Sequence, residues 1–184
     1  MELWIWILIA IVVLIGLTFF LYYNRFITLS NRIENSLSQI DVQLKRRAEL
    51  IPNLIETVKG YAKHEKSVMK SVNDARKALV GAQGVEDKIK ADGILEMALG
   101  KLFAIAENYP DLKANTNFLE LQKELSTTED RVAYARQFYN DNILTYNNMV
   151  QKLPGNFFAR IFGKTQKEFF KIAESERKNV KVEF

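Results

Sequence analysis

The chain has 184 residues, and its 26 basic side chains exceed its 22 acidic ones, giving a formal net charge of +4 at pH 7. The charges alternate in sign along the sequence, which is typical of solvated helix surfaces and unlike the basic stripe of a nucleic-acid interface. The chain contains no cysteine, so disulfides, thiolate nucleophiles and thiolate metal sites are excluded. Because the charges form no basic stripe, we expect no nucleic-acid partner.

Residues 3–23 form an uninterrupted run without a charged side chain. A helix of this length crosses roughly 30 Å, which is the thickness of the hydrocarbon core of a bilayer. Two tryptophans lie at one end of the run and two tyrosines at the other, as expected at the two membrane interfaces. The sequence thus predicts a transmembrane anchor over residues 1–24.

A cleavable secretory signal is the alternative for this segment. Such a signal has a basic leader, a shorter apolar core and small residues before the cleavage site. Here Met1 and Glu2 supply no positive charge, the core is long, and no small-x-small site follows it. We expect a retained signal-anchor in the cell membrane. Arg25 and Arg32 follow the span while no basic residue precedes it, which predicts an N-terminus outside the cell and a cytoplasmic C-terminal part.

Apolar residues at steps of three and four predict four helices after the anchor. The first stripe continues the anchor helix and comprises Phe26, Leu29, Ile33, Leu37, Ile40, Leu44 and Ala48. The second comprises Ile51, Leu54, Val58, Tyr61, Glu65, Val68, Val72, Ala75 and Leu79, and a stop is predicted at residues 81–84. The third comprises Leu95, Leu99, Leu102, Ala106 and Tyr109, with a short continuation through Phe118, Leu121 and Leu125 beyond Pro110. The fourth follows a predicted capping box at residues 126–129, ends at Pro154, and comprises Val132, Ala135, Tyr139, Asn142, Tyr146, Met149 and Leu153.

Each of these helices has one apolar side, so the four are stable only when they bury that side together. Short connections favour an up-and-down order. The predicted fold is therefore all-α, with an N-terminal transmembrane helix followed by an up-and-down four-helix bundle. We expect the anchor at residues 1–24, the bundle at residues 25–154, and an amphipathic, partly docked or flexible segment at residues 155–184.

The connection around Pro52 has two interpretations. Proline fits the first turn of a new helix, and it also fits a kink inside one long helix. We favour a turn here because it gives four helices of comparable length. The apolar stripe passes through Pro52 in register, so a continuous kinked helix is the alternative.

Three blocks of sequence resemble the LemA family of single-pass bacterial membrane proteins. They are Arg46-Arg47-Ala48-Glu49-Leu50-Ile51-Pro52-Asn53-Leu54 with the residues that follow to Ala75-Arg76, Glu107-Asn108-Tyr109-Pro110-Asp111-Leu112-Lys113-Ala114-Asn115 with Phe118, Leu121, Gln122 and Leu125, and Thr128-Glu129-Asp130-Arg131 with Ala135-Arg136, Tyr139-Asn140 and Tyr146-Asn147. The tail departs from the family pattern, because residues 163–166 lead to Phe169-Phe170 without the usual Gly-Phe. The resemblance implies an all-α bundle behind an anchor, and it implies no reaction.

Motifs for catalysis are missing from the chain. His64 is the only histidine, and Val68 stands where the zinc-peptidase helix His-Glu-x-x-His needs its second ligand. One histidine also excludes a di-iron bundle, and neither a nucleophile elbow nor a glycine-rich phosphate loop occurs. We expect no catalytic residues, no metal ligands and no cofactor, and therefore a protein that is not an enzyme.

Glu65 and Asn142 occupy positions that other turns of their helices fill with apolar side chains. Either the bundle opens to solvent there, or the side chain is buried with a partner, Arg136 or Asn142 in the case of Glu65, because an unpaired buried charge costs several kcal/mol. Such residues either fix the helix register or bind a partner. The polar candidates are Asn53, Lys59, His64, Glu65, Arg76, Arg136, Asn140, Asn142 and Asn147.

Residues 156–164 combine large apolar side chains with two cations. Core docking under the bundle is one interpretation. The other is a second membrane contact, in which aromatic residues insert near the headgroups and the cations meet anionic lipid. The candidate membrane-contact residues are Phe157, Phe158, Arg160, Phe162 and Lys164.

The sequence therefore predicts a membrane-anchored helical bundle that acts as a protein-interaction or scaffold module at the inner face of the cell membrane. Its expected partners are the lipid bilayer and one or more unidentified proteins, and it is a possible homo-oligomer. The alternative function is that of an accessory or regulatory subunit of a membrane protease or transporter complex.

Overall fold

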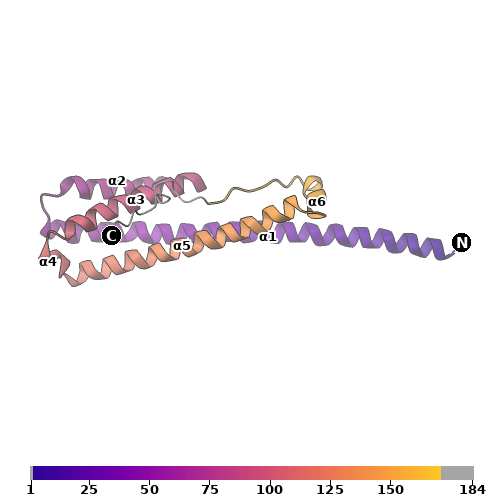
Figure 1. Cartoon of the computed structure of the whole chain (residues 1–184), viewed down its shortest axis with the longest axis horizontal. Helices are drawn as coiled ribbons and strands as arrows, with labels where there is room; N and C mark the ends of the chain where they lie inside the picture. The colour runs from indigo at the N-terminus through magenta and orange to yellow at the C-terminus, as the bar shows by residue number, and fades with distance from the viewer. Residues whose placement is uncertain (1, 171–184) are drawn as a thin grey trace, which may run out of the picture. The chain divides into compact units, whose positions relative to one another are not determined.

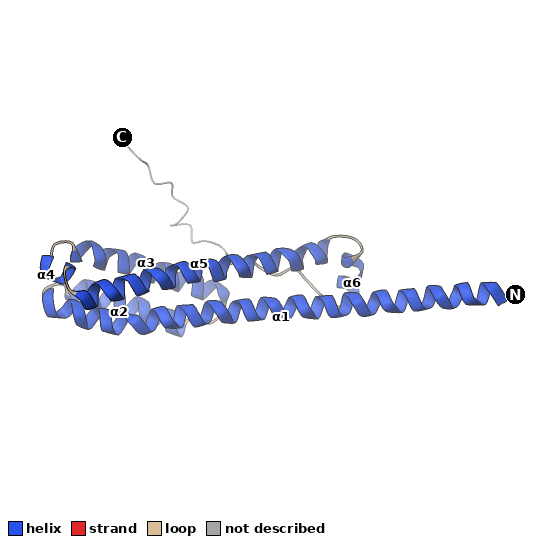
Figure 2. Cartoon of the chain, turned by 90° about the horizontal axis from the view of Figure 1, so that it is seen from below, coloured by secondary structure: helices blue, strands red, loops and turns tan. Residues whose placement is uncertain are grey.

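A computed structural model describes residues 2–170, and those residues contain six helices and no strand (Figures 1 and 2). The all-α prediction is confirmed. The predicted C-terminal segment extends to residue 184, and its part from residue 171 onward lies outside the described residues.

Helix α1 (Glu2–Tyr61) is one continuous helix of 60 residues with Pro52 inside it. The favoured turn at Pro52 is therefore wrong, and the continuous helix is the one that forms. The first break comes at residues 62–65, where the amide of Glu65 donates to the carbonyl of Ala62 over 3.1 Å. Within the described residues, α1 alone contains a stretch long and apolar enough to cross a membrane, and none of that stretch is buried.

Helices α2 (Lys66–Gly81) and α3 (Val85–Ala106) follow, and the predicted stop after the second stripe is confirmed. A short helix α4 (Pro110–Lys113) begins at the proline that breaks the third stripe. The long helix α5 (Thr116–Gln151) comes next, and α6 (Gly155–Ile161) closes the described helices.

The predicted capping box at residues 126–129 is wrong because α5 runs straight through it. The Thr128 hydroxyl donates to the carbonyl of Leu125 over 2.7 Å, which is a bond inside the helix. The cap lies eleven residues earlier in the chain, at Asn115, whose Oδ1 accepts from the amide of Phe118 over 3.0 Å. The segment Phe118 to Leu125, expected as a continuation of the third helix, therefore belongs to the fourth.

The helices form two compact units. Unit 2, which comprises residues 39–136 and Phe170, contains the end of α1, all of α2, α3 and α4, and the first part of α5. Its four long helical stretches bury most of the predicted stripe residues, whereas Tyr61, expected on the second stripe, is 42% exposed. Examples of its fully buried side chains are Ile40, Ile51, Leu54, Val72, Leu95 and Val132.

Unit 1 comprises residues 2–38 and 137–169 and contains the apolar part of α1, the second part of α5, and α6. Its core is aromatic. Phe26 is fully buried and packs edge-on against Tyr146, with ring centroids 5.9 Å apart.

Candidate interaction surfaces

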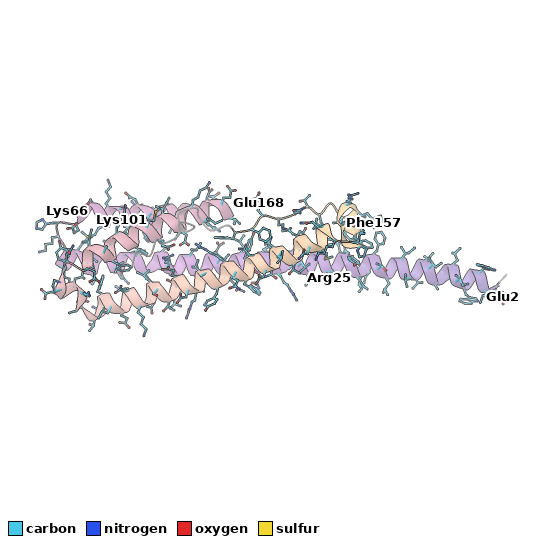
Figure 3. All side chains as sticks on the ribbon, in the orientation of Figure 1. Glu2, Arg25, Lys66, Lys101, Phe157 and Glu168 are labelled. Carbon is cyan, nitrogen blue, oxygen red and sulfur yellow. The ribbon has the colours of Figure 1, made fainter. Side chains whose placement is uncertain are left out.

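A groove of about 1050 Å³ lies in unit 2 between the end of α1 and the start of α2. We call it the basic groove, and it is lined by Pro52, Ile55, Glu56, Lys59, Lys63, His64, Lys66, Met69, Lys70, Asn73 and Arg76. Five of these side chains are Lys or Arg and only one is acidic. Ile55 and Met69 supply a nearly buried apolar floor. Lys66 marks the beginning of α2 in Figure 3.

The positive charge of the groove is largely uncompensated. Its single carboxylate, on Glu56, is paired with Lys59 over 2.5 Å. Within residues 2–170, no ion pair forms to Lys63, Lys66 or Lys70. An apolar floor beneath unpaired cations is suited to a ligand that carries both carboxylates and apolar side chains.

Arg76, which lines the groove, supplies a hydrogen bond that the backbone of α1 lacks. Proline has no N–H, so Pro52 cannot donate to the carbonyl of Ala48, its partner four residues earlier in an ideal helix. Arg76 Nε, on α2, donates to that carbonyl over 2.9 Å instead. Since Ala48 is 2% exposed, water does not replace this bond. The proline in α1 thus leaves free a carbonyl to which the arginine in α2 binds, and this hydrogen bond links the two helices.

The other candidates of this region lie at or near the groove. His64 is exposed in the α1–α2 connection and lines the groove together with Lys59. Asn53 is exposed on α1 and is not part of the lining. The sequence-predicted residues Lys59, His64 and Arg76 are therefore brought together by the fold, although 17 positions separate the first from the last.

Glu65 lies just before α2, half-buried, and not on an apolar stripe inside a helix. Its partner is Tyr109, whose hydroxyl donates to Glu65 Oε1 over 3.3 Å. The expectation that Arg136 or Asn142 is the partner is therefore wrong. Partial burial raises the pKa of the Tyr109 phenol, and the neighbouring Glu65 carboxylate raises it further. The bond ties the α1–α2 connection to the connection between α3 and α4.

Arg136 takes part in a buried charge cluster of unit 2. Asp92, on α3, is 0% exposed and pairs with Arg136 and with Arg47, the latter over 2.9 Å. Arg47 is 2% exposed and also reaches the half-exposed carboxylate of Glu129 over 3.3 Å. The guanidinium of Arg136 lies 5.1 Å from the ring centre of Phe170. Two carboxylates thus balance two arginines across three helices.

Sequence reasoning missed Arg47 and Asp92, although a signal exists for both. Asp92 precedes Leu95 by three residues on the apolar stripe of α3, and Arg47 lies between Leu44 and Ile51 at steps of three and four. Charged residues at stripe positions on two different helices, with opposite signs, indicate a buried ion pair.

The asparagine candidates of unit 1 are structural. Asn142 Nδ2 donates to the hydroxyl of Ser36 and to the carbonyl of Phe138, each over 2.9 Å, so it joins α5 to α1. Asn147 pairs with the main chain of Lys167 through both ends of its amide, again at 2.9 Å each. Asn140 is half-buried and also has a partner.

The α6 aromatics divide into two groups. Phe158 is 5% exposed and stacks on Tyr22 with ring centroids 4.5 Å apart. Phe162 meets Phe26 edge-on at 6.1 Å, so both side chains dock on α1. Phe157, labelled in Figure 3, is 56% exposed. Of the cations, Arg160 is exposed and Lys164 half-buried.

Within residues 2–170, no group of three or more His, Asp or Glu side chains is placed to hold a metal ion. The polar clusters that do occur are occupied by hydrogen bonds between helices. Two surfaces are candidates for binding a partner, the basic groove and the exposed side of α6.

Comparison with known proteins gives three findings. The LemA family model matches residues 36–184. Magnetosome protein MamQ of Magnetospirillum gryphiswaldense is 28% identical over 179 residues, which cover 83% of this chain and 66% of MamQ, so the chain spans just under two thirds of that relative. Protein LemA of Metamycoplasma hominis is 28% identical over 174 residues, covering 90% of this chain and 78% of the relative.

Proposed function

Because the chain belongs to the LemA family, we propose that it is a membrane-anchored interaction module without catalysis of its own, and that its basic groove binds an acidic, amphipathic segment of a partner protein. We also propose that this groove faces the cytoplasm, and the basic residues that follow the span support that orientation. The anchor is supported by the exposed apolar stretch of α1, which is long enough to cross a membrane.

The observation that carries this proposal is the composition of the groove. The lysines Lys63, Lys66 and Lys70 lie around an apolar floor and have no acidic partner within the described residues. The α1 residues that line the groove run from Pro52 to Lys59 and span about 10 Å, which equals about two turns of a helix. An acidic helix of that length places apolar anchors on the floor and carboxylates beside the lysines.

The test is photo-crosslinking of the full-length protein in native membranes. A photoreactive residue in place of Asn73, inside the groove, is expected to crosslink a partner other than this chain. Replacing Lys63 and Lys66 with Glu is expected to abolish the crosslink, because like charges then face the acidic segment. Replacing the exposed Lys101 and Lys123 of the same unit with Glu is the matched control and is expected to leave it intact.

Two results contradict the proposal: a crosslink that survives charge reversal in the groove, and a crosslink only to a second copy of this chain. The identity of a charge-dependent partner also distinguishes the two functions. A stoichiometric protease or transporter subunit supports the accessory-subunit alternative, whereas several non-enzymatic envelope proteins support a scaffold.

A further inference from the structure

Helix α6 is held against the end of the membrane-spanning stretch of α1. Phe158 packs edge-on against Phe19 at 5.0 Å and stacks on Tyr22 at 4.5 Å. Phe162 lies 5.5 Å from Tyr23. Figures 1 and 2 both show α6 beside this part of α1, and Figure 3 labels Phe157 on α6.

The tight turn before α6 fixes this position. A Cβ on Gly155 would lie 2.2 Å from the carbonyl oxygen of Met149, so only glycine lets the chain fold back this closely onto the last turns of α5. Because Tyr22 and Tyr23 end the apolar run, where aromatic residues mark the membrane interface, contact with them sets the depth of α6 at the level of the headgroups.

The side of α6 that does not contact α1 is apolar and is bordered by cations. Phe157 is 56% exposed and Ile161 is 50% exposed. Arg160 is also exposed, and Lys164 follows the helix. Residues 152–167 contain four basic residues and no acidic one. In water such exposed aromatic and aliphatic groups lose hydrophobic stabilisation, whereas at a bilayer surface they are buried.

We propose that α6 is a second membrane contact, in which Phe157 and Ile161 insert among the lipids and Arg160 and Lys164 bind anionic headgroups. The hydrophobic pair supplies insertion, and the cations supply the preference for anionic lipid. This differs from the expectation that all three phenylalanines insert, since Phe158 and Phe162 are used to dock α6 on α1.

The absence of native cysteine allows a direct test in the full-length protein. An environment-sensitive fluorophore is attached to an Ile161→Cys variant in lipid nanodiscs. Quenching by trace spin-labelled phosphatidylglycerol is compared with quenching by spin-labelled phosphatidylcholine. We expect quenching by both lipids and a several-fold preference for the anionic one, which falls as salt is added.

The charge variant identifies the binding residues. Replacing Arg160 and Lys164 with Gln in the labelled protein is expected to abolish this several-fold preference for anionic lipid, because the two cations supply it. The same change at Lys101 and Lys123, in unit 2, is the control and is expected to leave it unchanged. A label at the exposed Asn35, about 20 Å along α1 from Tyr22, reports the unquenched state.

Three results overturn the proposal. The first is an Ile161 label that is quenched no more than the Asn35 label. The second is protection of that label from aqueous quenchers without quenching by lipid, which would mean that protein covers α6. The third is equal quenching by anionic and zwitterionic lipid, which would remove the role of the cations.

Discussion

The bond between Arg76 and the carbonyl that Pro52 leaves free can be tested by a double-mutant cycle. Arg76→Met keeps much of the side-chain packing but removes the charged donor, which leaves the buried Ala48 carbonyl without the hydrogen bond from Arg76. A hydrogen bond to a charged group contributes about 1.5–3 kcal/mol, so we expect a loss of that size in the free energy of unfolding.

Pro52→Ala changes the outcome because it restores an amide donor four residues after Ala48. The single change is expected to stabilise the chain by up to about 3 kcal/mol, the cost of proline inside a helix. In that background Arg76→Met is expected to cost about 1–2 kcal/mol less than in the natural chain, since the carbonyl keeps a partner.

The assay is urea unfolding of the full-length protein in detergent, monitored by far-ultraviolet circular dichroism. The four proteins of the cycle can be compared when the free energy of unfolding depends on urea concentration with the same slope in each. Lys77→Met, at an exposed neighbour on α2, is the matched control and is expected to change the free energy of unfolding by less than about 0.5 kcal/mol. Equal losses for Arg76→Met in both backgrounds would refute the link between the proline and the arginine.

Two further predictions concern buried and half-buried charges. Asp92→Ala is expected to lower the free energy of unfolding by about 3–5 kcal/mol, because Arg47 and Arg136 lose the buried carboxylate that they share. Asp130→Ala, on the exposed side of α5, is the control and is expected to change it by less than about 0.5 kcal/mol. Similar effects of the two changes in urea unfolding would mean that the cluster is hydrated. The raised pKa of Tyr109 contributes stability below the unfolded value of about 10, and that contribution is lost as pH rises through the folded value. Glu65→Gln is expected to lower the pKa of Tyr109 in ultraviolet titrations that subtract a Tyr109→Phe background, and an unchanged titration would exclude the carboxylate as a cause.

The sequence was sufficient for the number and faces of the long helices, because apolar steps of three and four map directly onto buried residues such as Leu54, Val72 and Leu95. It was misleading at the joints. A proline inside α1 is tolerated because Arg76 on another helix satisfies Ala48, and that compensation lies 28 positions away. The residues next to Pro52 show only the helical hydrogen bond that proline loses, and not the bond from Arg76 that replaces it.

The interaction surfaces were partly predictable. Composition alone marked the aromatic and basic segment around α6, but which rings dock and which stay exposed depends on Tyr22 and on the close turn at Gly155. The basic groove was not predicted as a unit. Lys59 and Arg76 were singled out separately, and only the α1–α2 packing brings them to one surface.

The clamp between Asn147 and residue 167 has a consequence for how the segment after α6 can evolve. The side-chain amide of Asn147 makes two hydrogen bonds with the main chain of Lys167. These bonds depend on the path of the backbone and not on the side chain at position 167. Every amino acid except proline has the N–H that this fastening needs. Substitutions of Lys167 other than proline are thus expected to keep this fastening, and they remove only the contact between the Lys167 ammonium and the Tyr146 ring, which lie 5.6 Å apart.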